Sequence, residues 1–242
     1  MKAEAPYGWV VVWATFVCLA LIFGVSYSFA AFFASLAAEF AAQRADVSWI
    51  FGLSGLVYFV LGTLGGILAD RWGPRLVCST GMVLIALGLL ATSWAPALWV
   101  VYLSYGLLVG LGIAFVYTPS IASVQPWFTA RRGLAGGIAS SGVGAGTLLV
   151  PVLVAMGIAQ MPWREAMRVL ALVVFVLGLL AAGGWPAQAC AIGRTPRSRR
   201  HGLGSEPARD AAHADFSLVL PGHRARFTGD VHPVRAPVGF GP

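Results

Sequence analysis

Long apolar runs alternate with short polar breaks along the first three quarters of the chain. Six of these runs are each long enough to cross a hydrocarbon core of about 30 Å as a helix. The runs cover residues 9–36, 47–69, 76–94, 97–119, 133–157 and 166–185. The breaks carry charges, glycine or proline, as in "DRWGPR" at 70–75 and "SWAPA" at 93–97. The pattern therefore predicts an all-α, polytopic membrane protein whose six transmembrane helices form one bundle over residues 1–185.

The overall composition supports the same class of protein. Of the 242 residues, 58% are hydrophobic and only 10% are charged, and the mean hydropathy is +0.80. Soluble domains carry about 25% charged residues, so this chain has too few charges to cover a globular surface. The first apolar run is too long for a signal peptide, and Lys2 is the only basic residue before it. The lipid bilayer is therefore the expected surrounding, and a soluble enzyme is excluded.

The composition changes after residue 185. All four histidines, half of the fourteen prolines and eight arginines lie there, and no long apolar run remains. We therefore expect residues 186–242 to form a disordered cytoplasmic tail. The histidines lack metal-ligand spacing and the arginines lack interleaved aromatic residues, so neither a metal nor a nucleic acid is an expected partner. Out-of-frame translation of a GC-rich gene is another explanation of this composition.

Basic residues indicate the orientation of the spans in the membrane. If the N-terminus is cytoplasmic, nine of the twelve basic residues near the spans lie on the inner side. These nine are Lys2, Arg71, Arg75, Arg131, Arg132, Arg194, Arg197, Arg199 and Arg200, against Arg44, Arg164 and Arg168 outside. We therefore expect a multi-pass protein of the plasma (inner) membrane with both termini in the cytoplasm.

The stretch "GGILADRWGPRLV" (65–77) places three charged residues between two apolar runs. Retention of basic residues on the inner side explains the arginines, but it does not explain Asp70. A carboxylate at a helix C-terminus meets the negative end of the helix dipole and needs a cationic or dipolar partner. The pattern Gly66-x-x-x-Asp70-Arg71-x-Gly73-x-Arg75 resembles the signature loop between the second and third helices of the major facilitator superfamily. The resemblance implies a conformational gate on the cytoplasmic side, between two six-helix halves.

Two further stretches resemble the monocarboxylate porter and oxalate/formate antiporter branch of that superfamily. "YGWVVVWATF" (7–16) is similar to the start of the first helix in that branch, and "WFTARRGLAGGIASSGVGAG" (127–146) is similar to its fifth-helix signature. The resemblance covers residues 7–185. It implies that the six spans form the N-terminal half of a major facilitator fold. It also implies secondary transport of a small organic anion, by symport or antiport.

Glycines four residues apart let helices approach closely in lipid. The fifth run carries two such pairs, Gly133/Gly137 and Gly142/Gly146, and we expect both pairs to pack against another helix. A nucleotide-binding loop is a poor explanation of "GVGAG" (142–146), because such a loop follows a strand. Arg131 and Arg132, just before this run, serve either as membrane anchors or in the gate.

Three tyrosines lie within the apolar runs, namely Tyr27, Tyr58 and Tyr117. Each is either a packing residue or a residue of the substrate path, and Tyr27 lies in "SYSF" (26–29), which resembles a cavity-lining segment of the family. No charged residue lies deep in any run, although an anionic substrate needs a cation in the cavity. The family supplies basic residues from its first and eighth helices. The first run has none, and the sequence holds only six runs.

We therefore expect a transporter of small organic anions that is truncated after its first half. The alternatives are a non-transporting remnant, an accessory membrane subunit, and a carrier completed by a homodimer or by a separate C-terminal half. A membrane enzyme is disfavoured because no cluster of His, Asp or Glu lies within the runs. No cofactor or metal is expected, since Cys18, Cys78 and Cys190 show no ligand spacing.

Overall fold

Six long helices make up the part of the chain that the structure describes. The computed structural model describes residues 7–128 and 131–185, and these residues hold helices and turns but no strand. The elements are α1 (Tyr7–Glu39), α2 (Arg44–Trp72), α3 (Pro74–Ser93), α4 (Leu98–Val101), the π-helix η1 (Tyr102–Val109), α5 (Gly110–Val124), the 3-10 turn η2 (Gln125–Trp127), α6 (Arg132–Ile158) and α7 (Trp163–Gly183). The elements from α4 to η2 run on as one span, so six helices here are long and apolar enough to cross a membrane. The predicted all-α fold with six membrane-length helices is confirmed.

Local chemistry explains where α2 begins and ends. Before its first turn, the Gln43 N–H donates to the Asp46 carboxylate at 3.3 Å, as in a capping box. The helix stops at Gly73, whose φ of +89° suits a residue without a Cβ. Pro74 then opens α3 at a position where its missing N–H leaves no bond unmade. The turn predicted from glycine and proline therefore separates the second and third spans.

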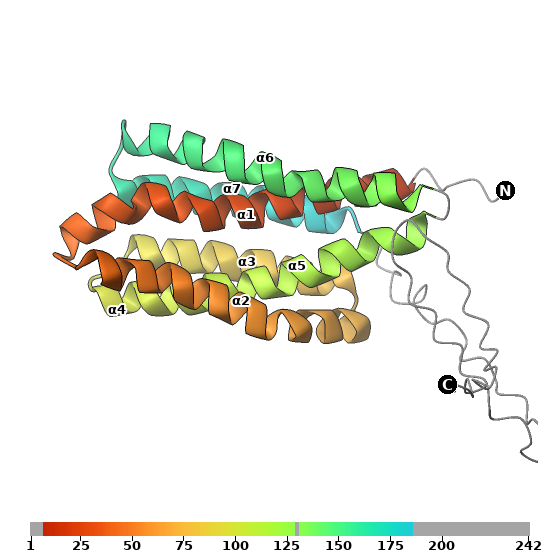
Figure 1. The fold of residues 1–242 in the computed structure, drawn as a ribbon, viewed down its shortest axis with the longest axis horizontal. Helices are drawn as coiled ribbons and strands as arrows, with labels where there is room; N and C mark the ends of the chain where they lie inside the picture. Colours follow the sequence, from red (N-terminus) through yellow and green to blue (C-terminus); the bar gives the residue numbers. More distant parts are fainter. Residues whose placement is uncertain (1–6, 129–130, 186–242) are drawn as a thin grey trace, which may run out of the picture. The chain divides into compact units, whose positions relative to one another are not determined.

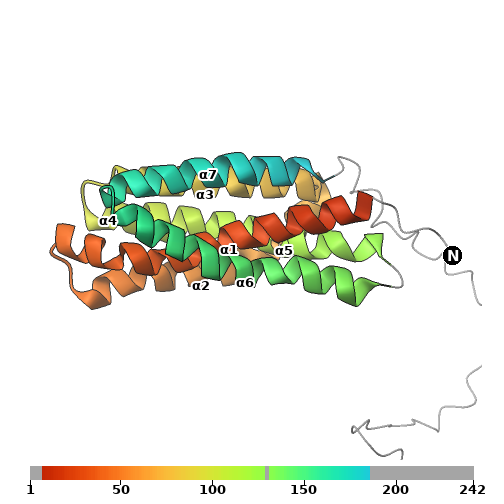
Figure 2. The same ribbon diagram turned by 90° about the horizontal axis from the view of Figure 1, so that it is seen from above.

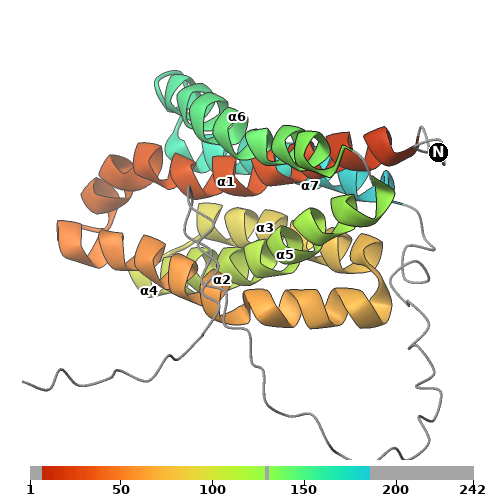
Figure 3. The same ribbon diagram turned by 45° about the vertical axis from the view of Figure 1, so that its right-hand side comes forward.

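The helices lie side by side in two groups. α1, α6 and α7 form one group, and α2, α3, α4 and α5 form the other (Figure 1, Figure 3). α1 packs along α6, and α2 packs along α5. α3 joins the groups, because it packs against both α5 and α7, as the view in Figure 2 also shows for α7. The buried side chains therefore gather around α1, α3 and α5.

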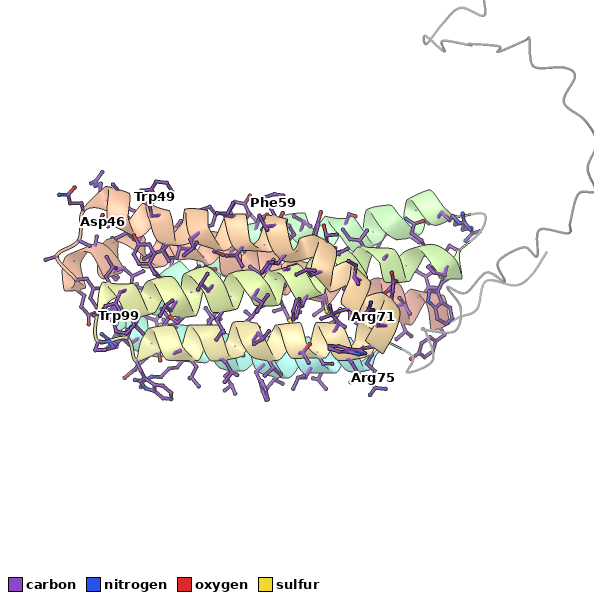
Figure 4. All side chains as sticks on the ribbon, turned by 90° about the horizontal axis from the view of Figure 1, so that it is seen from below. Asp46, Trp49, Phe59, Arg71, Arg75 and Trp99 are labelled. Atoms are coloured by element: carbon purple, nitrogen blue, oxygen red, sulfur yellow. The ribbon has the colours of Figure 1, made fainter. Side chains whose placement is uncertain are left out.

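The two ends of the bundle hold different connections (Figure 1). One end, here called the signature end, holds the start of α1, the α2–α3 turn and the end of α7, and the Tyr7 hydroxyl donates to the Gly184 carbonyl there at 2.9 Å. The α1–α2, α3–α4 and α6–α7 connections lie at the other end, here called the Arg164 end. Figure 4 shows Arg71 and Arg75 at the signature end and Asp46 at the Arg164 end. The described bundle thus begins and ends on the same side.

Glycines allow the closest contacts between helices. A methyl group on Gly65 of α2 would overlap the carbonyl oxygen of Ala114 in α5. α3 and α5 also approach closely, because a methyl group on Gly81 would lie 2.8 Å from the Gly112 carbonyl oxygen and one on Gly112 would lie 2.7 Å from that of Gly81. Such contacts replace the hydrophobic effect as the source of helix association in lipid.

Pro119 interrupts the hydrogen bonding of α5. Proline has no N–H, so the carbonyl of Phe115, four residues earlier, loses its partner within the helix. The buried Cys78 thiol of α3 lies 3.9 Å from the carbonyl oxygens of Phe115 and Val116, and 3.8 Å from the Ser120 hydroxyl. A neighbouring helix thus supplies the weak donor that α5 lacks, as is usual for proline in a membrane helix.

The predicted tail, residues 186–242, lies outside the described residues. By its contacts the chain divides into Met1–Ser198 and Arg199–Pro242, and everything described belongs to the first unit. The disorder and the out-of-frame origin proposed for the tail therefore stay predictions.

Candidate functional site

The signature motif forms a tight turn at one end of the bundle. The Gly73 N–H donates to the Ala69 carbonyl at 2.9 Å, and the Gly73 carbonyl accepts from Val77 at 3.3 Å, so the turn joins the last turn of α2 to the first of α3. Asp70, Arg71 and Arg75 are all exposed on it, and Figure 4 shows the two arginines at this end of the molecule. One acid and two bases thus lie exposed in the helix turns on either side of Gly73.

The same segment of α2 is held against α5. The Thr118 hydroxyl donates to the Gly62 carbonyl at 3.0 Å, and a methyl group on Gly66 would lie 3.2 Å from the Thr118 methyl. Among Gly62, Gly65 and Gly66, the closest approach to α5 is at Gly65 rather than at Gly66 of the motif. Sequence reasoning missed Gly65, because Gly62 and Gly66 show the four-residue spacing typical of helix packing and Gly65 does not. The position of the charged turn is therefore set by close packing of α2 on α5.

The basic residues before α6 also lie at the signature end. Arg131 precedes the first turn of α6, and its carbonyl accepts from Ala135 at 3.0 Å. The Arg132 guanidinium donates through Nε to the Phe128 carbonyl at 2.6 Å. Both side chains are exposed. Arg132 therefore ties the start of α6 to the end of the preceding span, and neither arginine reaches the middle of the bundle.

The four glycines of α6 that the sequence marks as packing residues differ in their surroundings. Methyl groups on Gly142 and Gly146 would overlap the carbonyl oxygens of Phe16 and Ala20 in α1. Nothing among the described residues lies within 4 Å of a methyl group placed on Gly133 or Gly137. The packing role expected for Gly133 and Gly137 is therefore not what the structure shows, because both are exposed, and the buried face of this part of α6 carries Ala135 and Ala139 instead.

The six tyrosines of the chain, all of them described, fall into two sets. Three donate their hydroxyl to a backbone carbonyl: Tyr7 to Gly184, Tyr102 to Asp46, and Tyr105 to Val25. The hydroxyls of Tyr27, Tyr58 and Tyr117 make no hydrogen bond with any described residue. The second set contains the three residues that the sequence marks as candidates for the substrate path.

These three tyrosines come from three helices and lie near one another. The rings of Tyr58 in α2 and Tyr117 in α5 have centroids 5.9 Å apart and meet edge to face. Tyr117 also packs edge to face on Phe23 of α1, at 5.7 Å. Tyr27 lies one turn further along α1 than Phe23 and is 52% exposed. We call Tyr27, Tyr58 and Tyr117 the tyrosine site.

A second polar group lies at the Arg164 end, and sequence reasoning missed the pairing of Arg164 with Glu39. The Arg164 guanidinium forms an ion pair with Glu39 at 2.6 Å, and it donates to the carbonyls of Ser93 at 2.7 Å and Ala95 at 2.9 Å. The Trp163 indole N–H also donates to the Glu39 carboxylate. The ends of α1, α3 and α7 are thereby joined. Charged residues more than 120 positions apart give no sequence signal of such a pairing.

Charged side chains of the described residues all lie near the helix ends, within about two turns. No group of three or more His, Cys, Asp or Glu side chains that could hold a metal ion occurs in residues 7–128 and 131–185. The tyrosine site therefore offers aromatic surface and phenol hydroxyls, and its own half of the molecule adds no charge to it. Such a site can hydrogen-bond a small polar ligand and pack against its apolar part.

α2 and α6 are the least covered of the spans. Only 17% of the most apolar window of each is buried, against 44 to 61% for the other four. Large apolar side chains such as Phe59 and Leu64 of α2 and Leu149 and Leu153 of α6 are exposed, and Figure 4 shows Phe59 pointing outward from the middle of α2. These helices border the tyrosine site and the α1 turn next to it, so the least covered faces lie next to the unpaired hydroxyls.

Comparison with known proteins gives one family. The chain matches the family model described as Major Facilitator Superfamily over residues 15–220. Monocarboxylate transporter 13 of Rattus norvegicus is 40% identical over 185 residues, which are 75% of this chain and 43% of that protein. Monocarboxylate transporter 11 of Homo sapiens is 34% identical over 223 residues, 89% of this chain and 46% of that protein. The chain thus spans less than half the length of these curated relatives.

The fold has a counterpart among solved structures. A crystal structure of the peptide transporter POT in complex with alafosfalin matches with a TM-score of 0.62 and 20% sequence identity. The match covers 71% of this chain and 37% of that one. At this identity the likeness concerns the arrangement of the helices.

Proposed function

Since the chain belongs to the Major Facilitator Superfamily, we propose that it forms one six-helix half of a secondary transporter of small organic anions of the monocarboxylate type. It is a multi-pass membrane protein, and the relatives reported above are transporters. The substrate class rests on the names of the relatives and on the chemistry of the tyrosine site.

The single observation that carries the proposal is the set of three phenol hydroxyls without a protein partner. Tyr27 is 52% exposed and Tyr58 and Tyr117 are half-buried, so their hydroxyls are open to a ligand or to water. Three helices bring these hydroxyls together, and the other three tyrosines all have a carbonyl to bind. Tyr27, Tyr58 and Tyr117 are thus suited to contact a polar ligand in a wet cavity, and we assign them to the substrate path.

The cation for a carboxylate substrate comes, in this proposal, from a second six-helix half. Superfamily transporters hold substrate near the membrane midplane between two halves, and a buried anion needs a positive partner. The described half offers only hydroxyls at its tyrosine site. The exposed faces of α2 and α6 are where we place the second half.

The orientation and the gate are part of the same proposal. With the signature end in the cytoplasm of a cell's plasma membrane, Arg71, Arg75, Arg131 and Arg132 lie on the inner side, as the distribution of basic residues favours. Asp70 then faces the second half as part of the gate. Reporter fusions at Ala42 and Arg194 test this, because they must report opposite sides of the membrane.

The proposal is tested by reconstitution in liposomes. The chain alone is expected to show no saturable uptake of lactate, pyruvate, formate or oxalate, and addition of the second six-helix half of a full-length relative is expected to produce it. Asp70→Asn is then expected to lower the rate of the assembled carrier. Saturable uptake by the chain alone would assign the second half to another copy of this chain. Absence of uptake in both preparations would show that the chain is not half of a carrier for these anions.

A further inference from the structure

The π-helix η1 contacts three helices through three consecutive buried residues. The Ser104 hydroxyl lies 2.8 Å from the Thr92 hydroxyl of α3, and the Tyr105 hydroxyl donates to the Val25 carbonyl of α1 at 2.9 Å. A methyl group on Gly106 would lie 2.8 Å from Leu53 of α2. π-Helical segments are rare and are often found at functional sites. A single turn of this π-helix therefore contacts α1, α2 and α3.

The bond from Tyr105 is made to the turn of α1 that carries Tyr27. Residues two apart on an α-helix lie about 200° apart around the axis and about 3 Å apart along it. Val25 accordingly faces the bundle and is 1% exposed, whereas Tyr27 faces outward. Tyr105 therefore bonds to the buried side of this α1 turn, and the Tyr27 phenol lies on the exposed side of the same turn.

Other contacts fix the same turn from further sides. The Phe29 ring packs on the Tyr105 ring with centroids 4.9 Å apart, and a methyl group on Gly24 would lie 2.5 Å from Val150 of α6. The Ser28 hydroxyl donates to the Gly24 carbonyl at 2.6 Å. Serine hydroxyls that bond back along a helix tend to bend it, so this turn needs an outside contact to keep one geometry.

We propose that Tyr105 is a positioning residue that fixes the direction of the Tyr27 phenol through its hydrogen bond to the Val25 carbonyl. The proposal rests on the assignment of Tyr27 to the substrate path, but the geometry that it describes exists in the half molecule without substrate. Tyr105 itself is buried, with 1% of its side chain exposed. Its hydroxyl acts only through the backbone of α1.

The test uses fluorine NMR of the full chain in lipid nanodiscs. Incorporation of 3-fluorotyrosine gives six signals, one for each tyrosine, and Tyr27→Phe identifies the Tyr27 signal. Tyr105→Phe is expected to shift or broaden the Tyr27 signal, because the α1 turn loses its fixed contact. Tyr102→Phe is the matched control, since Tyr102 also donates to a carbonyl from η1 but at the Arg164 end. An unchanged Tyr27 signal in Tyr105→Phe would overturn the proposal.

A second pair of variants covers the case in which Tyr105→Phe fails to fold. p-Aminophenylalanine at position 105 keeps a donor, and p-methylphenylalanine keeps the volume without one. The amino variant is expected to keep the Tyr27 signal and the methyl variant to move it; equal signals in the two would overturn the proposal. In the assembled carrier, Tyr105→Phe is expected to raise KM roughly two- to tenfold and to leave kcat nearly unchanged. A moved Tyr27 signal in a chain that supports no uptake would refute the proposed function and leave the positioning role in place.

Discussion

The polar side chains at the Arg164 end have hydrogen-bond partners within the described residues, whereas the hydroxyls of the tyrosine site do not. At the Arg164 end, one guanidinium joins Glu39 and two helix-end carbonyls, and an indole N–H binds the other carboxylate oxygen. At the tyrosine site, three hydroxyls from three helices have no partner among the described residues. The first region is complete within the described residues, and we propose that the second is completed by a ligand. The contrast is the basis for assigning the three tyrosines to the substrate path.

The largest expected effect on stability comes from comparing two glycines of α6, one packed against α1 and one exposed. Gly142→Ala places a methyl group on the Phe16 carbonyl oxygen, and we expect it to lower the free energy of unfolding by about 3 kcal/mol or to prevent folding. Gly137→Ala is the matched control, because no described residue lies within 4 Å of its methyl group. It should be neutral or stabilise by up to about 1 kcal/mol. Thermal unfolding in detergent measures both, and equal loss of stability in the two variants would contradict the close contact between α6 and α1.

The next effect concerns the Arg164 end. Arg164→Ala removes the ion pair with Glu39, which keeps only the Trp163 N–H, and leaves two carbonyls without this donor; we expect a loss of about 2 kcal/mol, reduced from the value of a buried network by partial exposure. Arg164→Lys keeps the charge but not the planar fork, so it should recover only part of this loss. Denaturant unfolding of the three proteins measures the series. If Arg164→Ala is as stable as the parent, the contacts of Arg164 do not stabilise this end of the bundle.

A smaller effect is expected at the proline in α5. Cys78→Ala removes the donor near the Phe115 and Val116 carbonyls, and we expect a loss of about 1 kcal/mol. Cys78→Ser keeps a donor of similar size and should lie closer to the parent. The comparison is made by thermal unfolding. A more stable Cys78→Ala than Cys78→Ser would indicate that α5 needs no donor at this point.

The smallest effects on stability are expected at the tyrosine site itself. Tyr27→Phe, Tyr58→Phe and Tyr117→Phe each remove a hydroxyl without a partner, so the free energy of unfolding should stay within about 0.5 kcal/mol of the parent. Tyr105→Phe breaks a buried hydrogen bond and should lose about 1 to 2 kcal/mol. A large loss in any of the first three would mean that its hydroxyl has a structural partner, and the contrast with the Arg164 end would fail.

The six helices could be predicted because membrane thickness fixes the length of an apolar run, and the Gly73-Pro74 turn could be predicted because each residue has a special backbone preference. Contacts between distant helices could not be read in this way. Spacing alone makes Gly133 and Gly137 look like Gly142 and Gly146, but only the latter pair faces α1. Likewise, sequence marks three tyrosines as candidates, but only the structure shows that their hydroxyls lack the carbonyl partner that the other three have.

The central claim, that the tyrosine site contacts substrate, is tested most directly by uptake kinetics of the carrier assembled with its second half. Tyr27→Phe is compared with Tyr7→Phe, whose hydroxyl binds the Gly184 carbonyl at the signature end. The account predicts that Tyr27→Phe raises KM for a transported monocarboxylate by roughly two- to tenfold, the value of one hydrogen bond, and that Tyr7→Phe leaves KM unchanged. Equal KM values for Tyr27→Phe and the parent would contradict the claim.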